Sequence, residues 1–318
     1  MTSAPQLSHR ASIMPASPIR KLVPLGDEAK ARGTHVYHLN IGQPDIETPP
    51  EFYDAVRSYQ EKVIAYGNSQ GIRLFIESLQ QYYDSLFIPL QYDDIVITTG
   101  GSEAIMFAMM AVAEPGDELL VFEPFYTNYN GFAIMAGIRL VPIATQAEEG
   151  FHLPSMEGIE ASMTPRTRGI IICNPNNPTG TVLRIEELHT VRDLALKHNL
   201  YVLSDEVYRE FVYEGETKSV LEIDGLQEHA VVMDSLSKRY SLCGGRMGCV
   251  ISRNRRFMDV MLRFGQARLC AATLEQVGAA ALVAEGAKYF EPMISEYRQR
   301  RDATFEELQT IPGMLCRK

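Results

Sequence analysis

The alternation of short, uninterrupted apolar runs with longer segments of helical periodicity constrains this fold more than any other feature of the sequence. Helical spacing of apolar residues appears at residues 102–114, 128–137 and 185–199. The seven apolar runs, each read as a strand, span residues 94–100, 118–123, 138–144, 168–174, 201–205, 229–235 and 246–252. Because strands that are apolar on both sides need cover on both sides, we predict an α/β fold: a mostly parallel seven-stranded sheet sandwiched by helices.

The two ends of the chain differ from this central pattern. The chain has 318 residues, which is enough for about two domains. The beginning is rich in proline, and helical patterns take over after about residue 254, at residues 255–270, 273–287 and 288–309. We therefore predict an N-terminal arm or small-domain segment at residues 1–45, a large domain at residues 46–285 and the start of an incomplete small domain at residues 286–318.

Charge and cysteine content exclude several classes of protein. The net charge is −10 with a pI near 5.3, which argues against a nucleic-acid partner. No apolar run is long enough to cross a bilayer, and the N-terminus lacks the apolar segment of a secretory signal. The five cysteines are odd in number and form no CxxC pair, so we expect neither a metal site nor disulfides, and a cytoplasmic location.

Ligands of open α/β sheets bind beyond the carboxyl ends of the strands, so the residues that follow each strand are the candidates for a site. A glycine pair followed by Ser102 and Glu103 opens a helix, where free N–H groups can hold an anion. A plain helix cap is the alternative interpretation. Tyr126 follows the next strand and can stack on a planar ligand, or it can belong to the core.

The next two strands are followed by polar residues of a different kind. Residues 174–180, "NPNNPTG", combine two X-Pro bonds with several polar side chains, Asn177 among them, and form a rigid turn at the sheet edge. Asp205 ends a buried strand, and Tyr208 lies three residues further on. A buried carboxylate costs free energy unless it is paired, so Asp205 either caps the following segment or faces a buried cation such as a protonated ring nitrogen.

The loop at residues 235–248, "SLSKRYSLCGGRMG", concentrates basic and hydroxyl groups in a net-acidic chain. Lys238 becomes a nucleophile toward carbonyls if it is desolvated or lies near other cations. Ser235, Ser237 and Arg246 can donate to a phosphate. Arg239 is interpreted as a solvated charge, and a solvated basic turn is the alternative interpretation of the whole loop. Together with the preceding candidates, this set suits a phosphorylated pyridine aldehyde bound as a Schiff base.

From about residue 19 onward the chain resembles the class I/II aminotransferases, fold type I pyridoxal-phosphate enzymes of the aspartate aminotransferase type. The motifs that carry the resemblance occur in the family's order: "LNIGQPD", "YGNSQG", "TTGGSEA", "EPFYTNY", "NPNNPTG", "SDEVYREFVY" and "SLSKRYSLCGGRMG". The resemblance implies that Lys238 forms a Schiff base with pyridoxal 5′-phosphate and moves the substrate proton. It implies that Asp205 pairs with the ring nitrogen, that Tyr208 and Asn177 bind the phenolic oxygen, and that Tyr126 stacks on the ring.

The same resemblance implies how phosphate and substrate are held. The phosphate is expected on the N–H groups of Ser102 and Glu103, surrounded by Ser235, Ser237 and Arg246. Tyr66 is expected to reach the phosphate of a neighbouring subunit, which implies a homodimer with shared sites. Gly42, through its backbone, and Asn177 are expected to contact the substrate.

The implied reaction is transamination between an amino acid, with aspartate as the best candidate, and a 2-oxo acid such as 2-oxoglutarate, in two ping-pong halves. It belongs to amino-acid metabolism and biosynthesis. A carbon–sulfur β-lyase built on the same residues is one alternative. The family continues beyond a segment like residues 311–318 with the arginine that binds the substrate α-carboxylate, so the other alternative is a truncated chain that binds the cofactor but is catalytically impaired.

Overall fold

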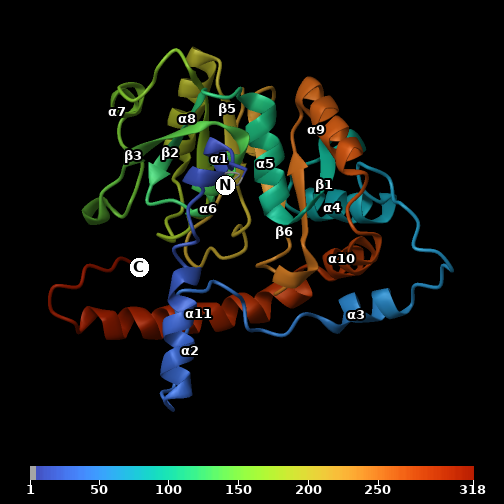
Figure 1. The fold of residues 1–318 in the computed structure, drawn as a ribbon, viewed down its shortest axis with the longest axis horizontal. Coiled ribbons are helices and arrows are strands. Elements are labelled where there is room, and N and C mark those ends of the chain that lie inside the picture. Colours follow the sequence, from blue (N-terminus) through green and yellow to red (C-terminus); the bar gives the residue numbers. More distant parts are fainter. Residues whose placement is uncertain (1–4) are drawn as a thin grey trace.

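A seven-stranded sheet forms the centre of the computed structural model, which describes residues 5–318 (Figure 1). The strand order is β1-β7-β6-β5-β4-β2-β3, and β7 alone runs in the direction opposite to the other six strands. The strands are β1 (Ile95–Thr99), β2 (Glu118–Glu123), β3 (Arg139–Ala144), β4 (Thr167–Cys173), β5 (Tyr201–Asp205), β6 (Ala230–Ser235) and β7 (Met247–Ile251). The predicted mostly parallel, seven-stranded α/β sheet is confirmed.

Helices cover both faces of the sheet, so that two separate apolar cores form (Figure 1). Successive residues of one strand enter different cores: Ile170 and Ile172 belong to the first, and Ile171 between them belongs to the second. The first core is completed by α4 (Arg73–Ser85), α7 (Met156–Glu160), α8 (Ile185–His198) and α10 (Thr273–Glu285). The second is completed by α5 (Gly100–Val112), α6 (Asn128–Ala136) and α9 (Arg255–Arg268). This two-sided cover is why the strand sequences are apolar throughout.

Local signals set the ends of these helices. The side chain of Asn254 accepts a hydrogen bond from Phe257 N over 3.0 Å at the start of α9. Gly137, with a φ of 78°, ends α6 in the left-handed conformation that glycine adopts without strain. Helix α5 begins at Gly100, two residues before the predicted start at residue 102, because the glycine pair belongs to the first helical turn.

Helices α2 (Val23–Ala31), α3 (Pro50–Arg57) and the long α11 (Ala287–Gln309) lie together beyond one edge of the sheet (Figure 1). Helix α1 (His9–Ile13) lies apart from them against α6, where Arg10 donates to Met135 O over 2.9 Å. Short 3-10 turns complete the described chain: η1 (Arg20–Leu22), η2 (Tyr92–Asp94), η3 (Ala147–Glu149), η4 (Val220–Glu222) and η5 (Cys243–Gly245). An extended segment at residues 41–48 contacts both the loop between β6 and β7 and helix α11. Thr48 donates to Ser241 O of that loop over 2.8 Å, and Asp45 pairs with Arg300 of α11 at 2.6 Å.

The sheet topology creates one edge where many loops meet. Strands β1, β2, β4, β5 and β6 all run in the same direction, since β1 and β6 are both antiparallel to β7 between them. Their carboxyl ends therefore lie at the same edge of the sheet. Antiparallel β7 begins at that edge, since Met247 pairs with Thr99 and Gly248 pairs with Ser235. The loops after those strands and the loop before β7 therefore converge. Within residues 5–318, no helix is both long and apolar enough to cross a membrane.

Candidate active site

Lys238 lies in the loop between β6 and β7, at the edge where the strand ends converge. Its Nζ donates to the carbonyl oxygen of Gly42 over 2.5 Å, which places the amine beside the extended segment. The same nitrogen lies 4.0 Å from the Cys243 sulfur and 6.0 Å from the ring centroid of Tyr208. The predicted residues Lys238, Gly42 and Tyr208, far apart in the sequence, are thus neighbours in the structure.

Several groups that could hold an anion meet where α5 begins. A Cβ added to Gly100, whose φ is 70°, would lie 2.4 Å from Nη2 of Arg246, so the guanidinium packs directly on this glycine. A Cβ on Gly101 would lie 3.6 Å from Cβ of Ser235. The hydroxyls of Ser235 and Ser237 are 2.8 Å apart, and Nη1 of Arg246 lies 3.5 Å from Ser237 Oγ. An arginine, two hydroxyls and a helix N-terminus together suit a bound phosphate.

Ser102 and Glu103 lie in the first turn of α5, where backbone N–H groups have no partner within the helix. The Glu103 carboxylate itself points elsewhere: it accepts from Thr99 N over 2.7 Å and pairs with Arg268 at 3.2 Å. The Glu103 side chain therefore binds the backbone of Thr99, the N-cap residue, and the alternative of a helix cap at Ser102 is wrong because the helix begins two residues earlier. The backbone N–H groups of the first turn are the ones available to an anion.

Asp205 ends β5 in a buried position, with 6% of its surface exposed. The Tyr129 hydroxyl donates to Oδ2 over 2.8 Å, and Val207 N donates to Oδ1 over 3.4 Å. Burial raises the pKa of Asp205 to about 6, although the Tyr129 hydrogen bond works against that rise. None of these contacts in residues 5–318 is with a cation, and a protonated ring nitrogen would supply one. The carboxylate, the anion site and the Lys238 amine thus fit a phosphorylated pyridine aldehyde.

The remaining predicted ring contacts surround the same place. Nδ2 of Asn177 lies 3.3 Å from the Tyr208 hydroxyl oxygen, and burial raises the pKa of Tyr208 above its ordinary value, so the phenol stays protonated. The Tyr126 ring lies edge-to-face with Tyr129 at 5.4 Å, and its hydroxyl accepts from Asn128 over 2.7 Å. Burial and the nearby Asp205 charge raise the pKa of Tyr126. These phenols can donate hydrogen bonds or present a ring face.

Tyr66 differs from the other predicted residues. Its side chain is 80% exposed, and no contact within the described part of the chain joins it to the cluster around Lys238. A role in the site of a second subunit, as the resemblance implies, requires such exposure.

Two features of the site were not predicted correctly. Tyr129 was not among the candidates: it lies in the first turn of α6, whereas Tyr126 precedes that helix. The interpretation of Arg239 as a solvated charge is wrong: the side chain is fully buried, and it pairs with Asp234 and Glu210. A buried guanidinium of this kind needs carboxylate partners, and these lie outside the loop motif.

Comparisons with known proteins identify the family of this chain. The family model described as aminotransferase class I and II matches residues 34–318. The chain is 32% identical to an aspartate aminotransferase of Thermotoga maritima over 299 residues, 92% of this chain and 78% of that protein. It is also 32% identical to the putative aminotransferase YugH of Bacillus subtilis over 286 residues, 88% of this chain and 73% of that protein.

Solved structures show the same relationship. An alanine aminotransferase from Pyrococcus furiosus matches with a TM-score of 0.89 at 30% identity, covering 97% of this chain and 80% of that one. A double mutant of the Thermus thermophilus aspartate aminotransferase also matches with a TM-score of 0.89, at 29% identity, covering 96% of this chain and 81% of that one. The family match extends over most of the chain and includes every strand of the sheet. The chain belongs to the class I and II aminotransferases.

Proposed function

We propose that this aminotransferase uses pyridoxal 5′-phosphate held by the residues that converge at the carboxyl edge of the sheet. The observation that carries the proposal is that Lys238, Asp205 and Arg246 surround the same two phenols: the Asp205 and Arg246 charges both act on Tyr126, and Asp205 also acts on Tyr208, whose ring centroid lies 6.0 Å from Lys238 Nζ. The cofactor, when bound, supplies an electron-withdrawing ring that makes the Cα proton of an attached amino acid acidic. Members of this family use that cofactor.

Different residues of the chain attach the cofactor, move the substrate proton and orient the ring. The Lys238 amine attaches the cofactor covalently, and it accepts and returns the Cα proton once a substrate is bound. Asp205 holds the proton on the ring nitrogen, because its carboxylate is buried and a cation there relieves the cost of burial. Tyr208 and Asn177 orient the ring through its phenolic oxygen, and Tyr126 covers one ring face.

The phosphate is fixed by the start of α5 and by the loop before β7. Arg246, Ser235 and Ser237 donate from side chains, while Ser102 and Glu103 donate from backbone N–H groups. Gly42, through its backbone, and Asn177 are the proposed substrate contacts; the position of Gly42 O, 2.5 Å from the Lys238 amine, supports the first.

Aspartate is the proposed amino donor and 2-oxoglutarate the proposed acceptor, in two ping-pong halves. Support comes from relatives named aspartate aminotransferase in Thermotoga maritima and Thermus thermophilus. Names of other relatives differ, such as the aromatic-amino-acid aminotransferase 2 of Thermococcus litoralis at 31% identity over 96% of this chain and 79% of that protein. The donor is therefore tested by a screen.

Assembly, location and domain division complete the proposal. We propose a cytoplasmic homodimer of amino-acid biosynthesis in which Tyr66 contacts the cofactor phosphate of the partner subunit. The exposed side chains of Tyr66 and of neighbouring Val63 and Ile64 support this.

We also propose an arm at residues 1–45, a cofactor-binding large domain at residues 46–285 and small-domain residues at 286–318. Gly286, where α10 ends and α11 begins, supports the second boundary.

The experiment is a spectral screen of the cofactor-loaded protein against single amino acids. Conversion of the bound cofactor to its pyridoxamine form by aspartate, and its reversal by 2-oxoglutarate, is the expected result. Release of ammonia and pyruvate from cystathionine without any 2-oxo acid would instead identify a β-lyase. In parallel, borohydride reduction and peptide mass spectrometry should find the cofactor on Lys238, and Lys238→Ala should abolish that adduct. An adduct on another lysine would overturn the assignment.

A further inference from the structure

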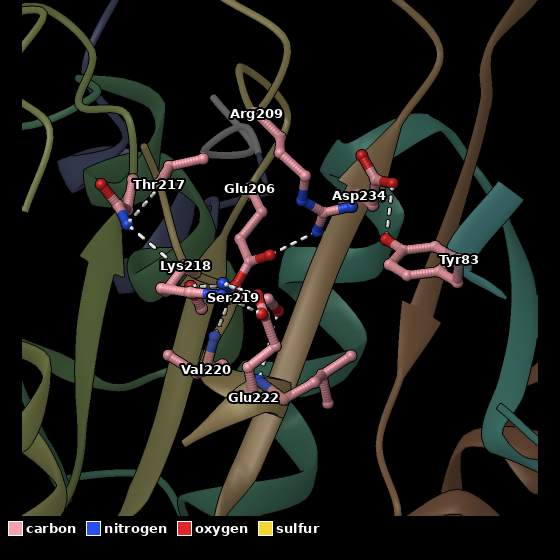
Figure 2. Close-up of polar contacts among 12 residues, drawn as sticks. Tyr83, Glu206, Arg209, Thr217, Lys218, Ser219, Val220, Glu222 and Asp234 are labelled. Atoms are coloured by element: carbon pink, nitrogen blue, oxygen red, sulfur yellow. Dashed lines mark hydrogen bonds and ion pairs between the residues drawn. The ribbon is translucent and has the colours of Figure 1, made fainter. Parts of the chain in front are cut away.

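A cluster of buried charges lies directly behind the loop that carries Lys238. Arg239, the residue after Lys238, is the largest fully buried side chain of the described residues. Asp234 is also buried, and its Oδ2 accepts a hydrogen bond from the Tyr83 hydroxyl over 2.8 Å. Figure 2 shows this bond and the second arginine of the cluster, Arg209, whose guanidinium pairs with Glu206 and lies 4.8 Å from the ring centroid of Tyr83. None of these charged residues is among the proposed cofactor-binding or substrate-binding residues.

Arg239 joins two carboxylates from different parts of the chain. Its Nη2 donates to Asp234, five residues earlier, and its Nη1 donates to Oε1 of Glu210 over 3.2 Å. Glu210 lies two residues after Tyr208. The guanidinium therefore connects the end of β6 with the segment that follows β5, and only Arg has a planar fork that spans two such acceptors.

The surroundings fix the guanidinium in place. It lies 4.8 Å from the ring centroid of Tyr82, and the Tyr82 hydroxyl donates to the same Glu210 oxygen. Burial alone would raise the pKa of Asp234, but the Arg239 and Arg209 charges outweigh it and hold that pKa below its usual range. Asp234 is thus a charged acceptor at neutral pH, and the pair with Arg239 persists throughout the working range of an enzyme.

The geometry assigns Arg239 as the positioning residue that sets the Lys238 amine against Tyr208 and Gly42. Asp234 Oδ1 also accepts from Ser235 N over 2.7 Å, so the first residue of the loop at residues 235–248 binds the same carboxylate. The Lys238 loop is therefore attached on one side to Ser235 and on the other to the Tyr208 segment. This inference rests on the proposed function, because it concerns the orientation of Lys238, the lysine proposed to attach the cofactor.

The direction in which the Lys238 side chain points depends on its backbone, because this side chain is long and flexible. Four methylene groups separate its backbone from Nζ, so a small change in the direction of the backbone moves the amine away from the reacting carbon. Misplacement of a reacting group by about 1 Å can cost about a hundredfold in rate. A shift of the loop that carries Lys238 would slow the chemical step while leaving substrate binding nearly unchanged.

The test is Arg239→Lys, which keeps the charge and loses the two-pronged fork. We expect kcat to fall at least tenfold while the KM for the amino acid changes less than threefold. A second readout uses the cofactor-free protein: the rate at which pyridoxal 5′-phosphate and borohydride label Lys238, followed by peptide mass spectrometry. We expect that rate to fall at least fivefold, because the amine no longer points at the bound aldehyde.

A matched control separates positioning from stability. Leu194→Ala removes a fully buried side chain from α8, near the opposite end of β5, and should lower the urea midpoint without changing kcat or the labelling rate. If Arg239→Lys behaves like Leu194→Ala, with a lower midpoint but kcat and labelling within twofold of the wild type, Arg239 is structural and the inference is overturned.

A second variant covers failure of Arg239→Lys to fold. Glu210→Ala breaks the connection to the Tyr208 segment and leaves the pair of Arg239 with Asp234 intact, and we expect it to lower kcat and the labelling rate at least threefold. Unchanged values in that variant would overturn the inference. Failure of the proposed function is recognised separately, because it would appear in the wild-type protein as absent labelling of Lys238 and absent transamination.

Discussion

The hydroxyl of Tyr129 donates a hydrogen bond to Oδ2 of Asp205 over 2.8 Å, and both side chains are buried. This contact joins α6 to the end of β5 and holds the carboxylate in one orientation. It also favours the charged form of Asp205 in surroundings that favour the neutral form, since burial raises the pKa of this group to about 6. The carboxylate is therefore poised so that a buried cation would bind to it strongly.

Tyr129→Phe should move the pH dependence of cofactor binding. As the pH falls through about 6, Asp205 takes up a proton and loses the charge that pairs with the ring nitrogen. Removal of the hydrogen bond raises the Asp205 pKa further, so we expect the pH midpoint of pyridoxal 5′-phosphate affinity to rise by about one unit. The measurement is a fluorescence titration of cofactor-free protein at several pH values. Tyr201→Phe, at the other end of β5, should leave the midpoint unchanged.

Asp205→Asn should stabilise the cofactor-free protein while it disables the site. The pKa of Asp205 in the folded protein, about 6, is above the ordinary 3.8, so this group favours folding below pH 3.8 and loses that contribution as the pH rises through about 6. The difference between the two values corresponds to ~3 kcal/mol. Asparagine avoids this cost, so we expect the free energy of unfolding to rise by ~1–3 kcal/mol at pH 8 and by much less at pH 4.

Urea unfolding of both proteins at the two pH values measures the effect. Cofactor affinity should fall in the same variant at pH 8, because the buried charge that pairs with the ring nitrogen is gone. A variant that is less stable than the wild type at pH 8 would contradict the conclusion that the buried Asp205 carboxylate destabilises the cofactor-free protein.

Much of the fold follows from the sequence because the relevant signals are local. The seven strands were predicted within about two residues, since a strand buried on both faces leaves an uninterrupted apolar run. Helix α4 was not predicted, although its buried residues Phe75, Ile76, Leu79, Tyr82 and Tyr83 have helical spacing. Three of the large side chains on that face, Phe75, Tyr82 and Tyr83, are aromatic, a composition that is common in strands as well.

The site was predictable where motifs carry it and not where distant residues complete it. Lys238, Asp205 and Arg246 lie within family motifs, so their meeting at one sheet edge was expected. The burial of Arg239 depends on Glu210, 29 residues earlier, and on Tyr82 of α4. No spacing rule relates residues on separate elements, so an arginine beside a loop lysine gives no sign that it is buried.

Arg246→Ala should weaken binding of the phosphorylated cofactor selectively. Loss of a charge-assisted pair costs about 2–3 kcal/mol, which corresponds to about a 30- to 150-fold rise in the Kd for pyridoxal 5′-phosphate. Pyridoxal, which lacks the phosphate, should bind both proteins within about twofold. Arg253→Ala is the control, because Arg253 donates to Leu221 O and Pro89 O, away from the α5 start. Equal losses for both ligands would remove Arg246 from the phosphate site.

Gly100→Ala and Gly116→Ala form a matched pair that tests the contact between α5 and Arg246. Both glycines have positive φ values, 70° and 93°, so alanine strains the backbone at either position by ~1–2 kcal/mol. Only at Gly100 would the new methyl group meet Arg246, 2.4 Å from Nη2, whereas nothing lies within 4 Å at Gly116. The guanidinium is the mobile end of a long side chain, so it moves aside and leaves the anion site. We therefore expect similar losses in the free energy of unfolding from the two variants, but at least a tenfold weaker affinity for pyridoxal 5′-phosphate in Gly100→Ala alone. Wild-type affinity in both would mean that the guanidinium can bind the phosphate from another position.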